Sequence, residues 1–143
     1  MLTELECKVL IPGSAKGTVI KSEEPLSFWG GVNPFTGEIT DRRHDHFGQV
    51  IKDKIFLFPK GRGSSTGSAV LLEAIRNGTA PAAIINLKED PILALGAIVA
   101  EELYHKAIPI LILSEDDFCK VMEGDTIKIE PGGRVLHQSC GAG

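Results

Sequence analysis

The part of this sequence best suited to chemistry is a stretch of glycine and hydroxyl residues, Gly61-Arg62-Gly63-Ser64-Ser65-Thr66-Gly67-Ser68. It follows an apolar run at 55–59 and precedes a helix-like run at 69–75. A strand that leads through such a turn into a helix points several backbone N–H groups at one place, and the helix dipole adds positive potential there. The pattern therefore predicts a site for a carboxylate or a phosphate, with Arg62 as an additional cation.

Three familiar motifs do not match this stretch. A Walker loop has a lysine after its last glycine, whereas Ser68 follows Gly67. A nucleophile elbow needs a serine where Gly63 stands, and the glycine spacing differs from that of a dinucleotide fingerprint. Two interpretations stay open: an anion site, or a turn in which Ser65 or Thr66 merely caps the helix. A cap needs one hydroxyl, and this stretch has four.

Length and charge exclude several classes of function. The 143 residues predict a single domain over 1–137 with a flexible tail over 138–143. A net charge of −4 without a basic run argues against nucleic acid as a partner. The chain has no stretch of about 20 apolar residues for a membrane span. Acidic residues stand where a signal peptide would be basic, so we expect a cytoplasmic protein.

Two groups of residues could suggest a metal. Cys7, Cys119 and Cys140 are scattered without a CxxC pair, so we expect free thiols and no metal on this chain. The segment 41–46 reads Asp-Arg-Arg-His-Asp-His, but its two histidines lack a third ligand on the same face of a strand. A solvated charged loop is the preferred interpretation of this segment, with a metal site as the alternative.

The elements that position these residues alternate in type. Strands are predicted at 6–11 and 17–20, and a long polar connection follows at 25–53. Beyond it, the patterns predict strands at 55–58, 82–85 and 108–113, helices at 67–77, 92–103 and 115–122, and a closing hairpin at 126–130 and 134–137. The fold class is therefore α/β: a β/β/α domain whose mixed sheet has a small parallel core.

Local signals support these elements. Gly78 suits the end of the first long helix, and Asp90-Pro91 suits the start of the next. That second helix is apolar on most faces and contains Gly96, so we expect it to lie in the core, close against the sheet. Phe28 and Trp29 are expected to cover the core, with a stacking platform as the alternative. His105 and His137 are expected to lie at the surface or a sheet edge and to form local hydrogen bonds.

Several segments together resemble the small, swivelling subunit of the aconitase X family, over about residues 5–130. The segments are Leu26-Ser27-Phe28-Trp29-Gly30-Gly31-Val32-Asn33-Pro34, Thr36-Gly37, Asp41-Arg42-Arg43-His44, Gly61-Arg62-Gly63-Ser64-Ser65, Asn77-Gly78-Thr79-Ala80-Pro81-Ala82-Ala83-Ile84-Ile85 and Asp90-Pro91-Ile92-Leu93-Ala94-Leu95-Gly96-Ala97. The resemblance implies an aconitase-type swivelling β/β/α domain and a hydro-lyase that removes water from a hydroxy acid. It also implies a large partner subunit that carries an iron–sulfur cluster on its cysteines.

The resemblance also implies a role for the glycine-rich stretch. Ser64 matches the serine that acts as general base in aconitases. A serine hydroxyl must act as an alkoxide, which backbone N–H groups, a helix N-terminus and a cation stabilise. Gly63, Ser65, Thr66 and Arg62 can supply these groups and bind substrate. Aconitases proper have a carboxylate-binding arginine where this chain has Thr66, which implies a different substrate.

Two substrates are known for the family. Phe-Trp-Gly-Gly at 28–31, Asp-Arg-Arg-His at 41–44 and Gly-Arg-Gly-Ser-Ser at 61–65 resemble the cis-3-hydroxy-L-proline dehydratases, whereas phosphomevalonate dehydratase small subunits tend to have Gly-Lys-Gly-Ser-Thr in the loop. Hydroxyproline is the preferred substrate and phosphomevalonate the alternative. A non-catalytic anion-binding, carrier or structural subunit is a third possibility, since fold does not fix function.

Overall fold

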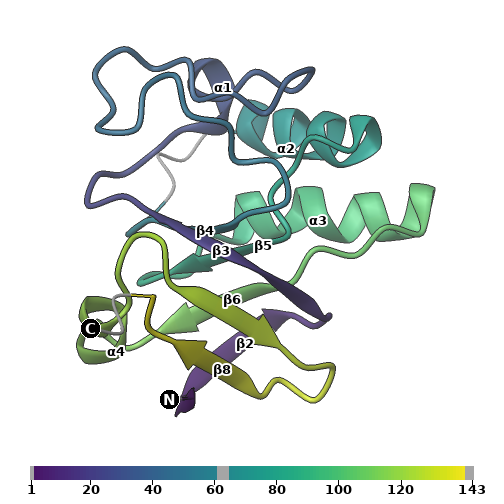
Figure 1. Cartoon of the computed structure of the whole chain (residues 1–143). Coiled ribbons are helices and arrows are strands. Elements are labelled where there is room, and N and C mark those ends of the chain that lie inside the picture. Colours follow the sequence, from purple (N-terminus) through teal and green to yellow (C-terminus); the bar gives the residue numbers. More distant parts are fainter. Residues whose placement is uncertain (1, 61–64, 141–143) are drawn as a thin grey trace.

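The computed structural model describes residues 2–60 and 65–140, without the side chains of Trp29, Ser65 and Thr66 (Figure 1). The strands are β1 (Leu2–Leu5), β2 (Cys7–Ile11), β3 (Ala15–Lys21), β4 (Ile55–Leu57), β5 (Ala83–Asn86), β6 (Ile110–Leu113), β7 (Thr126–Ile129) and β8 (Val135–Gln138). The helices are α1 (Phe28–Gly31), α2 (Ser65–Asn77), α3 (Pro91–Tyr104) and α4 (Glu115–Lys120).

The described strands form one mixed sheet in the order β1-β8-β7-β3-β4-β5-β6-β2. The four central strands, β3 to β6, run parallel, and the outer pairs are antiparallel. Strands β1 and β2 form opposite edges although only Glu6 separates them in the chain. The predicted fold class, a mixed sheet with a small parallel core, is confirmed.

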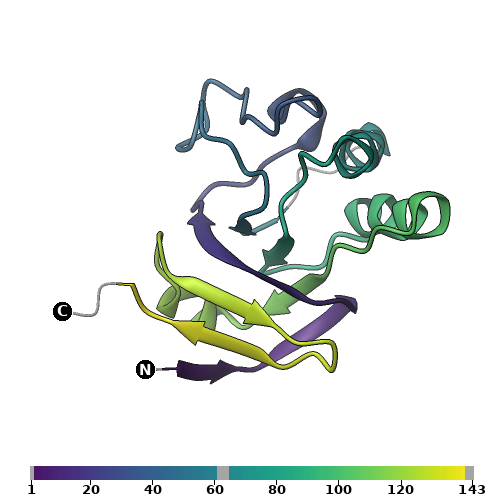
Figure 2. The same ribbon diagram turned by 45° about the vertical axis from the view of Figure 1, so that its right-hand side comes forward.

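Side chains of the parallel strands alternate between two cores. Phe56 and Phe58 point into the core beneath the helices, whereas Ile55 and Leu57 point into the core on the other side of the sheet. Figure 2 shows α2 and α3 on one side of the central strands and the β7–β8 hairpin on the other. The layers are therefore helices, parallel strands and an antiparallel hairpin, in agreement with the predicted β/β/α arrangement.

Most of the predicted elements are present within a few residues of their predicted bounds. The sequence patterns missed β1 entirely. The predicted connection at 25–53 contains α1 and two isolated bridges, Val32 with Ile39 and Glu38 with Val50. Buried apolar residues on this segment, among them Leu26, Ile39 and Ile51, extend the core beneath the helices, so the segment is packed and not merely a loop.

The local signals for helix and hairpin ends are confirmed. The Leu93 N–H donates to Asp90 Oδ1 over 3.1 Å and so caps α3. Gly78, just after α2, has a φ of 76°, and Gly133 in the β7–β8 turn has a φ of 89°. Glycine adopts this left-handed conformation without the steric cost that a Cβ would add.

Helix α3 differs from its prediction in two respects. A Cβ added to Gly96 would lie 2.5 Å from the Ser68 backbone oxygen, so this glycine packs against α2 and not against the sheet. The helix is also not wholly core: Leu93, Ala94, Ala97 and Ala100 are buried, but its outward face is exposed. The apolar residues on most sides of α3 predicted burial of the whole helix, but within this chain only its inner side is buried.

The ends of the chain bear on the predicted tail. Gln138 is the last residue of β8, and the Cys140 N–H donates to Asp125 Oδ1 over 3.0 Å. Residues 141–143 lie outside the described part of the chain, so the flexible tail stays a prediction. Among the described helices, none combines the length and the apolar character needed to cross a bilayer.

Candidate functional site

The described residues on both sides of the glycine-rich stretch lie at the end of the sheet where the parallel strands terminate. These strands end at Lys21, Leu57, Asn86 and Leu113, and residues 58–64 connect β4 to α2. Ligands of open α/β sheets bind outside the carboxyl ends of the parallel strands, where helix N-termini also point. The described residues that flank the predicted anion site therefore lie at the end of the sheet where such sites occur, and the site itself stays a prediction.

Backbone hydrogen bonds fix the residues that lead into this stretch. The Leu87 and Lys88 N–H groups both donate to the Pro59 oxygen, over 2.9 and 3.2 Å. The Leu26 N–H donates to the Lys60 oxygen over 3.3 Å. The segments after β5 and before α1 therefore hold the chain at Pro59 and Lys60 from two sides.

Asn86 is a polar residue of this edge that the sequence analysis did not single out. Its side chain is fully buried, and its Nδ2 donates to the Phe58 oxygen over 2.8 Å. Its Oδ1 is buried and has no hydrogen-bond partner among the residues that the structure describes. The sequence did contain a signal for Asn86: it is a polar amide at the end of the apolar strand Ala83–Asn86. A buried amide at that position needs a hydrogen-bond partner, and the end of the neighbouring strand can provide one.

The far end of the stretch is fixed by helix packing. Helix α2 begins at Ser65, and the Ser68 backbone oxygen lies against Gly96 of α3. The absence of a side chain at Gly96 allows the two helices to approach closely at the first turn of α2. The helix end whose N–H groups would bind an anion is therefore positioned by α3.

A second segment, residues 41–46, lies near the same edge and is held by side chains. Ser22, which follows β3, is fully buried, and its Oγ lies 2.9 Å from His44 Nε2 and 2.7 Å from Asp45 Oδ1. His44 is only 5% exposed. The preferred interpretation of 41–46 as a solvated loop is wrong for His44, because Ser22 provides a buried partner that the sequence did not reveal.

Serine, histidine and aspartate here are not arranged as a nucleophilic triad. The His46 N–H donates to His44 Nδ1 over 3.1 Å, so neutral His44 carries its proton on Nε2 and donates it to Ser22 Oγ. The Ser22 hydroxyl in turn donates to Asp45. A histidine that donates to the serine cannot remove its proton, so this network serves to hold the segment.

His46 and Asp45 complete the network. His46 Nε2 contacts the Lys21 oxygen and lies 3.5 Å from Glu123 Oε1. Burial of Asp45 favours its neutral form, but hydrogen bonds from Ser22 and the Glu23 N–H and the charges of His44 and His46 outweigh this effect. They hold the pKa of Asp45 below its ordinary value of 3.8.

His137 is a second histidine that is more buried than predicted, since it was expected at the surface or a sheet edge. It is buried, not exposed, and its Nε2 lies 2.7 Å from Asp125 Oδ2. Burial alone would raise the pKa of Asp125, but hydrogen bonds from His137 and from the Cys140 and Met122 N–H groups lower it. His105 is exposed, as predicted, and ends α3 with a φ of 54°.

Comparison with known proteins identifies the family. Residues 4–137 match the family model described as the aconitase X swivel domain. The chain belongs to this family. It is 37% identical to the Thermococcus kodakaraensis aconitase X in a holo-form crystal structure, with a TM-score of 0.85 over 96% of this chain and 99% of that one.

Two relatives show two contexts for the aconitase X swivel domain. The chain is 50% identical over 108 residues to the cis-3-hydroxy-L-proline dehydratase of Pseudomonas aeruginosa, covering 76% of this chain but 19% of that protein. It is 42% identical over 127 residues to the phosphomevalonate dehydratase small subunit of Methanothermobacter thermautotrophicus, covering 89% and 92%. The chain thus corresponds to the small subunit of aconitase X-type hydro-lyases, and it spans about a fifth of the longer dehydratase.

The residues predicted for catalysis fall mostly outside the described part of the aconitase X domain. Arg62, Gly63 and Ser64 lie outside the described residues. Ser65 and Thr66 open α2, but their side chains are not described. The roles of all five residues therefore stay predictions. Phe28 is buried in the core, as expected for a residue that covers it.

The described part of the chain does not assemble a metal site. No three His, Cys, Asp or Glu side chains within it gather closely enough to hold an ion. Cys7 is half-buried and donates to the Gly133 oxygen, and burial raises the pKa of its thiol. Cys119 and Cys140 are exposed free cysteines. These residues do not fit an iron–sulfur cluster.

Four exposed cationic residues belong to segments at this end of the sheet. Arg42 and Arg43 lie on the turn that the Ser22 network holds, Lys60 follows β4, and Lys88 follows β5. None of these four side chains has an ion-pair partner among the described residues. Unpaired cations near a helix N-terminus favour binding of an anion, in agreement with the charge of a hydroxy acid.

Proposed function

We propose that this chain is the small subunit of an iron–sulfur-dependent hydro-lyase that dehydrates cis-3-hydroxy-L-proline. Family membership over residues 4–137 supports the reaction class and is the observation on which the proposal rests. The motifs at 28–31, 41–44 and 61–65 support the substrate. The name of the P. aeruginosa relative, which shares 50% identity over the aligned residues, favours the same substrate.

In this proposal Ser64 is the general base. It takes the proton from the carbon next to the substrate carboxylate, and the electron pair of that C–H bond forms the C=C bond. The C–O bond to the neighbouring hydroxyl breaks, the hydroxyl leaves as hydroxide, and this hydroxide and the abstracted proton together account for the water that is lost. The backbone N–H groups of Gly63, Ser65 and Thr66 and the cation of Arg62 stabilise the serine alkoxide. Ser64 directly precedes the first residue of α2 in the chain, where the helix dipole favours negative charge.

The proposal assigns the cluster and the rest of the substrate site to a large aconitase X subunit. We place the cluster there because the family resemblance implies it and because the described residues of this chain do not fit one. The small chain contributes the base and the cationic edge. The two chains together would enclose the substrate, and neither would dehydrate it alone.

A second candidate substrate is phosphomevalonate. It is favoured by the small subunits of phosphomevalonate dehydratase, which match this chain over most of their own length, as in M. thermautotrophicus with 92%. Both substrates carry a carboxylate and a hydroxyl group, so the exposed cations suit the carboxylate of either. An assay of the purified two-chain complex with each compound distinguishes them, and turnover of phosphomevalonate alone would overturn the hydroxyproline assignment.

The role of Ser64 is tested in the two-chain complex by Ser64→Ala. Loss of a general base lowers kcat by roughly 10²–10⁴-fold, with little change in assembly. Ser14→Ala is the matched control. Ser14 is exposed and lies in the turn between β2 and β3, at the amino end of β3 and thus away from the carboxyl ends of the parallel strands. A Ser64→Ala complex with the native rate would favour a purely anion-binding or structural subunit.

A further inference from the structure

The outward face of α3 is apolar and exposed. Ile92, Leu95 and Ile98 are 39%, 53% and 46% exposed. Their spacing of three residues places them on one side of the helix, and Leu103 continues the same side at the carboxyl end. We call Ile92, Leu95, Ile98 and Leu103 the α3 face.

This face is unusual for the surface of a small protein. A helix at a protein surface presents charged or polar residues outward, whereas here Glu101 and Glu102, near the carboxyl end, are the first charged residues of α3. Contiguous exposed apolar side chains mark a surface that a partner covers. A contact that removes water from the α3 face would complete the burial that the inner side of the helix already has.

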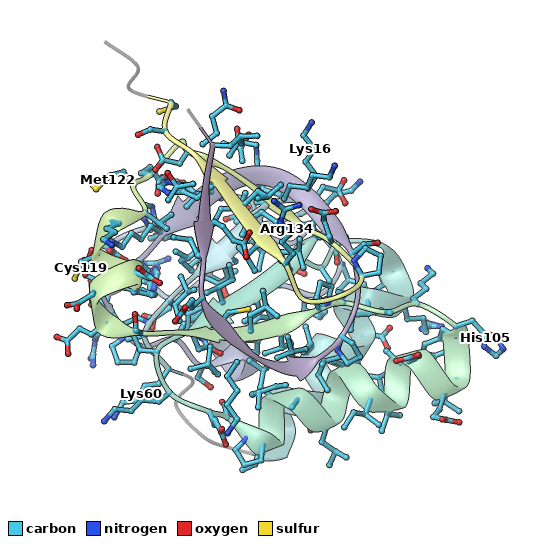
Figure 3. The ribbon with its side chains drawn as sticks, turned by 90° about the horizontal axis from the view of Figure 1, so that it is seen from below. Lys16, Lys60, His105, Cys119, Met122 and Arg134 are labelled. Atoms are coloured by element: carbon cyan, nitrogen blue, oxygen red, sulfur yellow. The ribbon has the colours of Figure 1, made fainter. Side chains whose placement is uncertain are left out.

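The α3 face is continuous with the candidate site. The helix begins at Pro91, a few residues after the carboxyl end of β5, and Gly96 lies against the Ser68 oxygen of α2. In Figure 3, His105 marks the carboxyl end of α3, and Lys60 lies toward its amino end. A partner protein that covers the end of the sheet where the parallel strands terminate would therefore contact Ile92 first, and then Leu95 and Ile98.

We propose that the α3 face docks on the large aconitase X subunit. The inference rests on the proposed function, in which that subunit supplies the other half of the site. In relatives such as the P. aeruginosa protein, the aligned segment is about a fifth of a much longer chain, so a large polypeptide is covalently joined to the same domain there. Interfaces of permanent subunits have apolar centres of this kind, where the loss of one large side chain weakens assembly strongly.

The test measures the Kd of the folded small chain for the purified large subunit. Leu95→Glu and Ile98→Glu place a charge on the α3 face, and we expect each to raise Kd by roughly tenfold or more. Leu2→Glu is the matched control. Leu2 is 60% exposed on the edge strand β1, which lies on the opposite side of the fold from α2 and α3 (Figure 2), so the substitution should leave Kd unchanged.

Folding is checked by thermal unfolding of each variant, and Leu95→Ala provides a milder change that keeps the helix. We expect Leu95→Ala to raise Kd severalfold and to leave kcat unchanged when the large subunit saturates it. If Leu95→Glu, Ile98→Glu and Leu95→Ala all bind the large subunit with the Kd of the native chain, the docking proposal is wrong, whereas the proposed function is unaffected.

Two further outcomes separate the alternatives. A native small chain that does not bind the large subunit would overturn the proposed function and the docking face with it. A native small chain that forms a dimer, which Leu95→Glu dissociates without changing capture of the large subunit, would assign the α3 face to a second copy. That result would overturn the docking inference and leave the hydro-lyase proposal standing.

Discussion

Two segments at the same edge of the sheet are held in different ways. The entry to the glycine-rich stretch is held mostly by backbone groups: the Leu87, Lys88 and Leu26 N–H groups donate to the oxygens of Pro59 and Lys60. Residues 41–46 are held by side chains that converge on the hydroxyl of Ser22. Backbone bonds form whatever the side chains are, whereas the Ser22 network depends on each of its members.

The difference bears on function as well as stability. In the proposed function, the glycine-rich stretch carries the general base at the start of a helix, and a misplaced reacting group would lower the rate steeply. The segment 41–46 carries Arg42 and Arg43, whose exposed guanidinium groups need only lie near the edge to attract an anion. We therefore expect substitutions at the first segment to affect rate and stability, and those at the second to affect mainly stability and substrate affinity.

Among the substitutions that test how the two segments are held, the largest effect on stability is expected at Gly96. In Gly96→Val the new side chain meets the Ser68 oxygen, since even a Cβ would lie 2.5 Å away. Overpacking of this kind lowers the free energy of unfolding by about 1–3 kcal/mol and displaces the first turn of α2. Urea unfolding and the dehydratase rate of the complex measure both. Gly132→Ala is the control, because no atom lies within 4 Å of its added Cβ; equal stability of the two variants would contradict the packing argument.

The side-chain network is tested by Ser22→Ala. The substitution leaves the buried His44 Nε2–H without its acceptor, which lowers the free energy of unfolding by about 2 kcal/mol. The reaction rate of the complex should fall less than in Gly96→Val, and KM for the anionic substrate should rise. The exposed Ser14→Ala should change stability by less than about 0.5 kcal/mol. A Ser22→Ala variant as stable as Ser14→Ala would show that the network does not hold the segment.

Asn86→Leu separates backbone from side-chain support at the first segment. It removes the hydrogen bond to the Phe58 oxygen but also removes the unpartnered buried Oδ1, so the two effects partly cancel. We expect a loss of about 1 kcal/mol, smaller than for Ser22→Ala. Chemical denaturation of both variants measures the order. If Asn86→Leu lost more unfolding free energy than Ser22→Ala, the Asn86 side chain, and not the backbone hydrogen bonds, would be the main support of the entry to the glycine-rich stretch.

The smallest effect is a dependence on pH. The pKa of Asp45 is lower in the folded chain than the ordinary value of 3.8 that applies on unfolding. Its contribution to stability is therefore present above about pH 4 and is lost as the pH falls through the folded pKa. Denaturation between pH 6 and pH 2.5 should show a shallower decline for Asp45→Asn than for the native chain. Parallel declines would contradict the role of Asp45; Asp125, whose pKa is also lowered, contributes to both curves.

The sequence by itself determined the parallel β/α/β part of the fold and where its turns lie. Runs such as Ile55–Leu57 and Ala83–Asn86 are short, apolar and bounded by turn residues, and Asp90-Pro91 caps α3 through groups only three residues apart. These signals are local, so no knowledge of distant contacts is needed. The resemblance to the aconitase X family came from the same local motifs, and the family match confirmed it.

The tertiary structure alone decided which residues meet across the chain. Ser22 and His44 are 22 residues apart, and Asn86 and Phe58 are 28 apart. The second hydrogen bond follows from the pairing of β4 with β5, and the first from the way the connection between β3 and β4 folds back on the end of β3. Gly96 packs against α2 because the two crossover helices lie side by side on one face of the sheet (Figure 1). For the same reason, the sequence could not predict which side of α3 stays exposed. Apolar residues on a helix indicate burial, but only the fold shows which side this chain buries by itself.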